Sequence, residues 1–286
     1  MTTIIYTIIA MCAFAANSIL CRIALLEGHI DAGSFTIIRI VSGAITLIAI
    51  WLIAKKPSET KLISDKKSFL TSSISLFIYA LLFSYAYIKL GTGTGALILF
   101  GIVQLSMLTF HIVKGNRLTF FEWVGIAVAV TGFLILLLPS ATRPDLFSAL
   151  LMGISGLSWA IFTLQGKRSG EPLRSTTQGF MGSAVLSVIC LPWLIDLESI
   201  NQTGMWLAVI SGAVTSALGY VIWYSALRGL TVLSASIVQL SVPAIALVGG
   251  LFIVSEPLSM NIILSTACIL GGIALVFLSQ KQMSRK

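Results

Sequence analysis

The chain has 286 residues, of which 57% are hydrophobic and 10% are charged, and its mean hydropathy is +1.01. A soluble domain of this composition could not cover its own surface with polar side chains, so the sequence predicts a multi-pass membrane protein. The formal net charge of +8 does not indicate a nucleic-acid partner. In a membrane protein, an excess of lysine and arginine marks the loops that stay in the cytoplasm.

Apolar segments of about twenty residues recur along the chain, and a helix of this length crosses roughly 30 Å of hydrocarbon. The first segment has no basic stretch before it and is too long for a cleaved signal peptide, so we expect it to be retained as a transmembrane helix. The ten expected spans are 3–25, 34–54, 69–88, 92–113, 119–138, 147–166, 173–195, 204–227, 231–254 and 260–279. The predicted fold class is therefore an all-α membrane protein with ten transmembrane helices.

Cationic residues collect in alternate loops. One set of loops carries Lys55, Lys56, Lys61, Lys66, Lys67, Lys114, Arg117, Lys167, Arg168, Arg174, Arg228, Lys281, Arg285 and Lys286, whereas the opposite set holds only Lys89 and Arg143. This asymmetry predicts an even number of spans with both chain ends in the cytoplasm.

Two related stretches indicate that the chain consists of two halves. Residues 92–118 and 231–258 are similar in pattern, and TGFLILLL from Thr131 resembles GGIALVFL from Gly271. Because each half would hold five helices, an odd number, the second half should enter the membrane from the opposite side, as an inverted-topology repeat. The expected organisation is a repeat at 1–140, a second repeat at 146–280 and a cytoplasmic tail at 281–286. The alternative is that any two apolar helices look alike.

The four cysteines lie inside apolar spans and lack the spacing of a disulfide framework or a zinc site. We expect Cys12, Cys21, Cys190 and Cys268 to be small buried side chains, and we expect no metal and no cofactor.

All ten carboxylates fall in loops or at span ends: Glu27, Asp31, Glu59, Asp65, Glu122, Asp145, Glu171, Asp196, Glu198 and Glu256. A proton-driven carrier usually keeps an acidic residue near the middle of the membrane. The sequence therefore favours transport by alternating access that is driven by the substrate's own gradient or by exchange. His111 is the remaining titratable candidate, and an interfacial or structural role is favoured for it.

Two arginines lie inside spans. Arg39 is about five residues from the outer end of its span. It is expected either to reach the periplasmic interface with its long side chain or to act as a gate or a partner of a substrate carboxylate. Arg22 is closer to its helix end, so reaching the interface is the favoured interpretation.

Polar and aromatic side chains at mid-span are the best candidates for a binding site. Tyr79 is too deep for the interfacial aromatic belt, so its hydroxyl needs an internal partner. Two further groups recur at helical spacing, Ser155 with Trp159 and Thr163, and Ser216 with Tyr220 and Trp223. The expected substrate-binding residues are Asn17, Tyr79, Gln104, Trp159, Thr163, Tyr220, Trp223 and Gln239. Amide, hydroxyl and aromatic groups of this kind suit a small zwitterion with an apolar side chain, whereas simple helix packing is the alternative for each group.

A second set of residues is expected to gate or bend helices. Pro243 removes one helical hydrogen bond and shares a face with Ser236 and Gln239, so this face should line protein or water. Glycines before and in the fourth span permit close packing or bending. The expected gating and hinge residues are Arg39, Gly91, Gly95 and Pro243.

Short motifs carry a resemblance that covers nearly the whole chain. They are FAANSILCRIAL in the first span, SFTIIRIVSGA in the second, GTGTGALILFG in the fourth, and SEPL after the Pro243 helix, before a final helix with paired glycines. In order and spacing these motifs resemble the EamA family of the drug/metabolite transporter (DMT) superfamily, closest to YddG-type amino acid exporters. The resemblance implies a central cavity walled by helices three, four, six, eight and nine with parts of helix one. The first half departs from the family pattern at Gln104 and at Asn116, where a proline and a glutamate are usual.

These observations lead to a transporter that exports amino acids or related small metabolites across the inner membrane. The expected partners are a small-molecule substrate and the lipid bilayer, with a monomer sufficient for function and a dimer as the alternative. Proton-coupled drug or metabolite efflux, a passive channel and a lipid translocator stay open. An intramembrane enzyme is disfavoured because no nucleophile–base or metal motif lies at membrane depth. A carrier of sugar phosphates is disfavoured because little positive charge is expected at mid-membrane.

Overall fold

The computed structural model describes residues 2–54, 62–63, 65–113, 119–137, 144–169, 171–230, 235 and 238–283. Ser236, the side chain of His111 and many of the cationic loop residues lie outside this part of the chain. Its regular elements are α1 (Thr2–Leu26), α2 (Ala32–Ala54), α3 (Lys66–Tyr87), α4 (Thr92–Val113), α5 (Phe120–Leu137), α6 (Leu146–Ser169), α7 (Pro172–Leu194), η1 (Leu197–Ser199), α8 (Gln202–Ile210), η2 (Ser211–Leu218), α9 (Gly219–Leu227), α11 (Ser241–Ile253) and α12 (Met260–Met283).

Each predicted span overlaps one of these helices, and α8, η2 and α9 together form the eighth. Six segments are long and apolar enough to cross a membrane: Thr2–Leu26, Ala32–Ile53, Lys66–Tyr87, Leu146–Gly166, Pro172–Leu194 and Gln202–Leu227. The shorter apolar segments are Thr92–Met107, Phe120–Leu136, Ser241–Ile253 and Met260–Val276. The described helices therefore form a multi-pass membrane protein, with six clear spans by length and composition.

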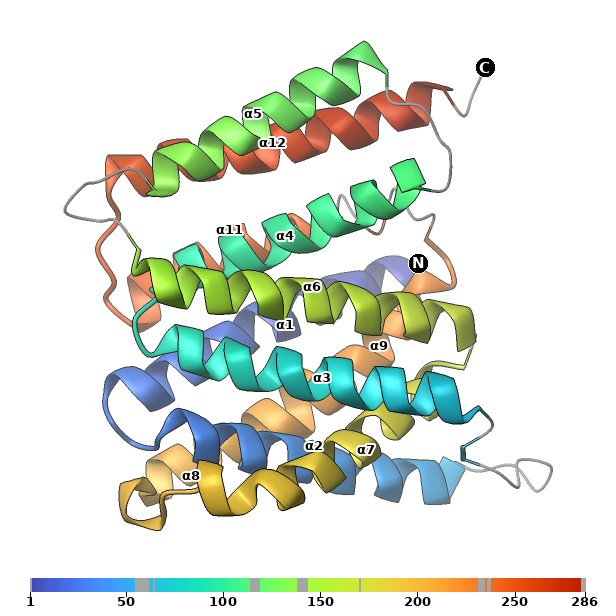
Figure 1. The fold of residues 1–286 in the computed structure, drawn as a ribbon, viewed down its shortest axis with the longest axis vertical. Coiled ribbons are helices and arrows are strands. Elements are labelled where there is room, and N and C mark those ends of the chain that lie inside the picture. The colour runs from blue at the N-terminus through green and yellow to red at the C-terminus, as the bar shows by residue number, and fades with distance from the viewer. Residues whose placement is uncertain are drawn as a thin grey trace.

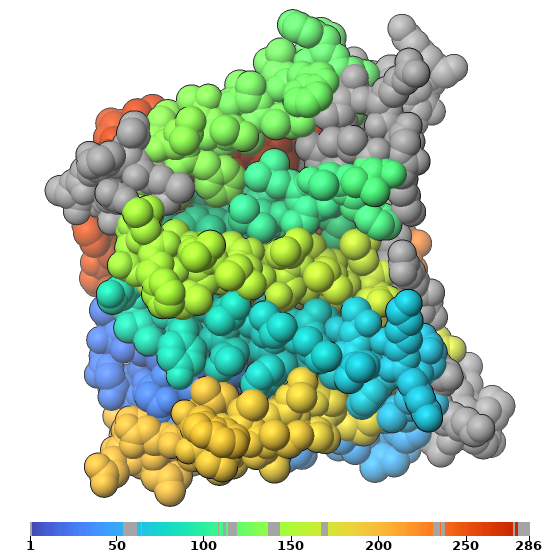
Figure 2. All heavy atoms as spheres, in the orientation of Figure 1, coloured from blue at the N-terminus to red at the C-terminus, as the bar shows by residue number. Residues whose placement is uncertain are grey.

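The helices lie side by side and are stacked along the long axis of the molecule (Figure 1). At one end α5 packs on α12, next to the pair α4 and α11, and α2 and α7 lie at the other end. The start of α1 and the end of α12 lie on the same side of the stack. In Figure 2 the side chains of α6, α3 and α7 form successive bands across one face.

Close backbone approach joins α5 to α12. A Cβ atom on Gly272 would lie 2.5 Å from the backbone oxygen of Gly125 and 2.5 Å from the backbone nitrogen of Ala129. We expect Gly272→Leu to force the two helices apart and to lower the free energy of unfolding by about 1–3 kcal/mol. Thermal unfolding in detergent measures this loss. Gly271→Leu is the matched control, because a Cβ there meets nothing within 4 Å; equal loss in both variants would contradict the packing role.

Hydrogen bonds tie loops together on the side of the stack away from the chain ends. Asp31 accepts a hydrogen bond from the backbone N–H of Ser34 at the start of α2 (2.9 Å) and another from the Ser199 hydroxyl beyond α7 (2.7 Å). Burial raises the pKa of Asp31, but the hydrogen bonds from Ser34 and Ser199 outweigh it and hold the pKa below its ordinary value. The carboxylate is thus the favoured form in this tie between α2 and the loop before α8.

The cysteine prediction was correct for Cys21 and wrong for Cys12. Cys21 is buried, Cys12 is exposed, and Cys190 and Cys268 are half-buried. The physical reason is that an apolar span has both a protein-facing and a lipid-facing side, so apolar neighbours in sequence do not establish burial.

Candidate substrate-binding site

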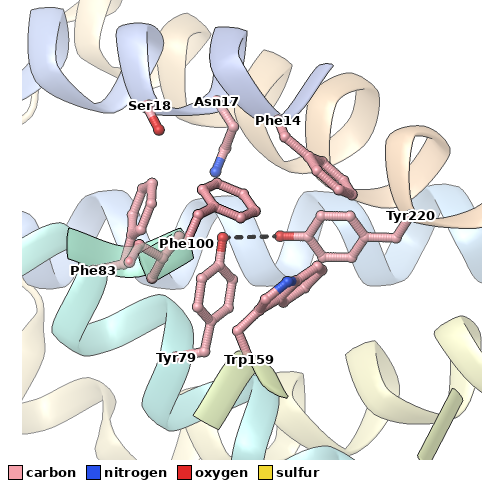
Figure 3. Close-up of a pocket in the computed structure, with 9 residues that line it drawn as sticks. Phe14, Asn17, Ser18, Tyr79, Phe83, Phe100, Trp159 and Tyr220 are labelled. Carbon is pink, nitrogen blue, oxygen red and sulfur yellow. Dashed lines mark hydrogen bonds between the residues drawn. The ribbon is translucent and has the colours of Figure 1, made fainter. Parts of the chain in front are cut away.

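A small pocket lies where α1, α3, α4, α6 and α9 meet (Figure 3). It is lined by Phe14, Asn17, Ser18, Tyr79, Phe83, Leu99, Phe100, Trp159 and Tyr220. Most of these side chains are apolar or aromatic, and the polar ones are few and converge on the same space, as in small-molecule sites generally.

Aromatic rings pack tightly around the pocket. The ring centroid of Trp159 lies 4.6 Å from that of Tyr220, 4.9 Å from that of Tyr79 and 5.7 Å from that of Phe14. Trp159 is 2% exposed and Tyr220 is 1% exposed. These separations are typical of favourable aromatic pairs, so the cluster is a rigid wall rather than a loose lining.

Arg39 lies directly behind this wall. Its Nε donates to Ser216 Oγ (3.0 Å), and its Nη2 donates to the hydroxyls of Tyr79 (3.2 Å) and Tyr220 (3.0 Å). The side chain is 2% exposed. The expectation that Arg39 reaches the interface is wrong, because its face of α2 packs against η2 and α3 instead of lipid. Sugar-phosphate transport was disfavoured because little positive charge was expected at mid-membrane. The buried guanidinium of Arg39 beside the pocket is a positive charge that this argument did not include.

Asn17 joins α1 to η2. Its Oδ1 accepts hydrogen bonds from the hydroxyls of Ser211 (2.6 Å) and Ser216 (3.4 Å). The Thr215 hydroxyl also lies beside it (3.3 Å) but donates its one proton to the backbone oxygen of Ser211 (3.0 Å). Figure 3 shows its amide nitrogen turned toward the pocket. The side chain therefore presents a donor to the pocket while its acceptor is occupied.

The π-helical stretch η2 explains why three hydroxyls lie close to the side-chain oxygen of Asn17. Residues four and five apart share a face when the helix bonds from i to i+5, so Ser211, Thr215 and Ser216 all reach Asn17. Segments of π-helix occur often at functional sites. Nothing in the apolar pattern of this span predicted the change of helix type.

The structure brings four of the predicted binding residues together. Asn17, Tyr79, Trp159 and Tyr220 line the pocket. The other four predicted binding residues, Gln104, Thr163, Trp223 and Gln239, are buried in the bundle but do not line it. The Trp223 ring contacts Phe14 from behind at a centroid distance of 5.9 Å.

The predicted hinge residues occupy close-packed positions. A Cβ on Gly91 would lie 3.3 Å from the Glu256 carboxylate, and one on Gly95 would clash with the Tyr87 ring. Pro243 is buried in α11. At Gly91 and Gly95, close packing is a sufficient reason for glycine. Bending at either glycine or at Pro243 stays a prediction.

Sequence reasoning missed several lining residues. Phe14 lies three residues before Asn17 and Phe83 four residues after Tyr79, so helical spacing from the predicted residues could have found both. Most of the helices in the cavity wall implied by the resemblance line this pocket: α1, α3, α4, α6 and, in the eighth span, α9. The described part of the ninth span, residues 235 and 238–254, contributes no residue to it.

A second polar cluster joins α1 to the end of α3, the start of α4 and the segment after α11. Arg22 Nε pairs with Glu256 Oε1 at 3.0 Å, and Arg22 Nη1 donates to the carbonyl oxygens of Tyr87 (2.9 Å) and Ile88 (3.0 Å). Glu256 Oε2 accepts from the backbone N–H of Thr92 at 2.7 Å. We call this cluster, comprising Arg22, Glu256 and the backbone at 87–92, the Arg22–Glu256 latch. It corrects the expectation that Arg22 reaches the interface.

Comparison with known proteins decides the family. The model of the EamA-like transporter family matches residues 1–138 and again residues 146–278. The chain belongs to the EamA family. It is similar to an uncharacterised protein of Pseudomonas aeruginosa, with 41% identity over 96% of the chain and 94% of that protein. It is also similar to an uncharacterised transporter of Archaeoglobus fulgidus, with 24% identity over 81% of the chain and 83% of that protein.

The fold agrees with this membership. A crystal structure with 17% sequence identity superposes with a TM-score of 0.69 and covers 96% of the chain and 98% of its own. As a member of the EamA family, the protein is a membrane transporter and not an enzyme. The pocket is therefore a candidate site for binding a transported molecule.

Proposed function

We propose that this EamA-family protein exports amino acids or related small metabolites across the bacterial inner membrane through its central pocket, as the resemblance to YddG-type exporters implies. The observation that carries the proposal is the pocket itself, in which aromatic rings surround Asn17 and the hydroxyls of Tyr79 and Tyr220. Aromatic walls suit an apolar side chain, and a few converging polar groups suit a polar head.

We further propose that the chain is an inverted repeat of residues 1–140 and 146–280. One support is that the family model matches the two halves separately. A second is the packing: for the helix pairs with the most extensive contacts, the helices at the corresponding positions of the other half are also in contact. Thus α1 packs on α9 as α3 packs on α6, and α1 packs on α11 as α6 packs on α4. Two such halves can rock against each other around a central site, which is the basis of alternating access.

The position of the acidic residues favours a carrier without proton coupling. In the described ranges, carboxylates lie in loops or within the first turn of a helix, as Glu122 does in α5. A buried acidic residue in mid-helix would be needed to carry a proton beside the substrate. The proposed transport is therefore driven by the substrate's gradient or by exchange. Proton-coupled efflux is the alternative.

Transport in liposomes tests the proposal. We expect purified protein to release labelled amino acids or related metabolites from loaded vesicles, with a rate that saturates and rises when unlabelled substrate is present on the far side. Protein-free liposomes are the control. A rate that never saturates would identify a channel, and strict dependence on an imposed pH gradient would identify proton coupling; either result would contradict the mechanism.

A further inference from the structure

Arg39 is a buried cation without a buried anion. A guanidinium stays protonated in proteins, yet the three hydrogen bonds of Arg39 go to neutral hydroxyls, and its Nη1 has no partner. Among the described residues no carboxylate pairs with it. Aromatic faces give it partial compensation, with its Cζ 5.0 Å from the Phe83 ring centre and 5.3 Å from that of Tyr79. A buried charge is normally paired, so the pocket on the other side of the Tyr79 and Tyr220 hydroxyls is suited to an anion.

The adjoining pocket has more donors than acceptors. Tyr79 accepts hydrogen bonds from both Arg39 and Tyr220, so its own hydroxyl proton is available to another acceptor. The Nε1 of Trp159 is buried and has no acceptor. Asn17 turns its amide nitrogen to the same space, since its oxygen is occupied (Figure 3). Hydroxyl, indole and amide donors around one space match the oxygens of a carboxylate.

The same surroundings offer little to an ammonium group. Besides an aromatic face, such a group needs hydrogen-bond acceptors or an acidic side chain. Asn17 Oδ1 already accepts from Ser211 and Ser216, and none of the nine lining residues is acidic. The charge of Arg39 would also repel a cation across the Tyr79 and Tyr220 hydroxyls. A single guanidinium balances a single negative charge, and the rings around it favour an apolar remainder over a strongly hydrated dianion.

We propose that the pocket recognises the carboxylate of its substrate, with Arg39 as the balancing charge, and that a substrate amino group is not required. The substrate class is then organic monocarboxylates with an apolar or aromatic side chain, amino acids being included only through their carboxylate. This inference rests on the proposed transport function, whose site it shares.

Binding to the purified full-length protein in detergent tests the proposal. The probes are 3-phenylpropanoate and 4-methylpentanoate, their two amides, 2-phenylethylamine and phenyl phosphate. Binding is followed by quenching of tryptophan fluorescence and by the shift in thermal unfolding. We expect at least one carboxylate to bind at least tenfold more tightly than its amide, and the amine not to bind. Equal affinity for acid and amide, tighter binding of the amine or the phosphate, or no binding of either carboxylate would overturn the proposal.

Substitution of Arg39 provides the second measurement. We expect Arg39→Gln to remove the preference of carboxylate over amide, while Lys89→Gln, which removes an exposed cation, leaves it unchanged. If Arg39→Gln does not fold, Arg39→Lys keeps the charge with fewer donors and is expected to weaken carboxylate binding while retaining the preference. An undiminished preference in Arg39→Gln, or a lost preference in Arg39→Lys, would contradict the role of the charge.

Flux through liposomes separates this inference from the proposed function. Carboxylate binding without flux would leave the anion site standing and refute transport through it. Flux of the amides or the amine at the rate of the acids would support transport and refute the anion site. Absence of both binding and flux would refute both.

Discussion

Trp159→Ala is expected to reduce transport at least a hundredfold while the variant is still inserted in the membrane. The indole packs against Tyr79, Tyr220 and Phe14 at the centre of the pocket, so its removal leaves a cavity in the wall that positions the substrate. Truncation of a buried tryptophan also costs about 3–5 kcal/mol of stability. Initial rates in liposomes, normalised to folded protein, measure the transport loss separately from the stability loss.

Two further variants make this result specific. Trp159→Phe keeps most of the aromatic surface, so we expect it to retain stability and to lose only a part of the rate. Trp206→Ala is the control, because Trp206 is 54% exposed on α8 and lies away from the pocket. Normal transport by Trp159→Ala would show that the aromatic wall is helix packing alone.

Glu256→Gln is expected to loosen the contacts of the Arg22–Glu256 latch, which join α1 to the end of α3, the start of α4 and the segment after α11. Arg22 is 9% exposed, and loss of its partner leaves a nearly buried charge unbalanced. Breaking a buried pair in this way costs about 3–5 kcal/mol, reduced here because both side chains retain some solvent contact. The arrangement seen here, in which the pair is formed, loses this energy, whereas an arrangement in which the pair is apart would not. The population should therefore shift toward opening.

Thiol accessibility measures that shift. In a background without the four native cysteines, Ser18→Cys places a reporter in the pocket lining, and we expect Glu256→Gln to accelerate its labelling at least tenfold. Replacing both latch residues by glutamine should reverse part of the effect, since no unbalanced charge remains. Lys89→Gln breaks an exposed pair with Asp145 at 3.7 Å and should change little. Unchanged labelling in Glu256→Gln would contradict a gating role.

The helices were largely predictable, whereas the chemistry of the site was predictable only in part. Hydropathy locates a residue along a span, and this predicted Tyr79, Trp159 and Tyr220 at mid-span, where the structure brings all three to one pocket. It does not say which side of the helix faces protein. This limit explains the error at Arg39. Its position near the end of the span suggested that the side chain reaches the interface, but the side chain points toward η2, where it contacts Ser216.

Long-range pairing was the second limit. The latch joins residues 234 positions apart, and one sequence without relatives gives no sign that Arg22 and Glu256 meet. The π-helical stretch η2 was invisible for a similar reason. Its change of hydrogen-bond register accompanies contacts of Ser211, Thr215 and Ser216 with Asn17, which is about 200 residues earlier in the chain, and one sequence does not show such contacts.

The buried guanidinium of Arg39 has an electrical consequence. In the described part of the chain no acidic side chain lies deep enough to bring a proton along with a bound anion. A monocarboxylate would therefore cross without a proton, and Arg39, which balances its charge in the pocket, would stay with the protein. One negative charge would move in each transport event, and the voltage across the membrane would act on it directly. That voltage contributes about 2.3 kcal/mol per charge for each 100 mV, and with a negative interior it pushes anions outward. At a voltage of about 100 mV, a carrier of this design would need no coupling ion to export its substrate against a concentration ratio of roughly fiftyfold.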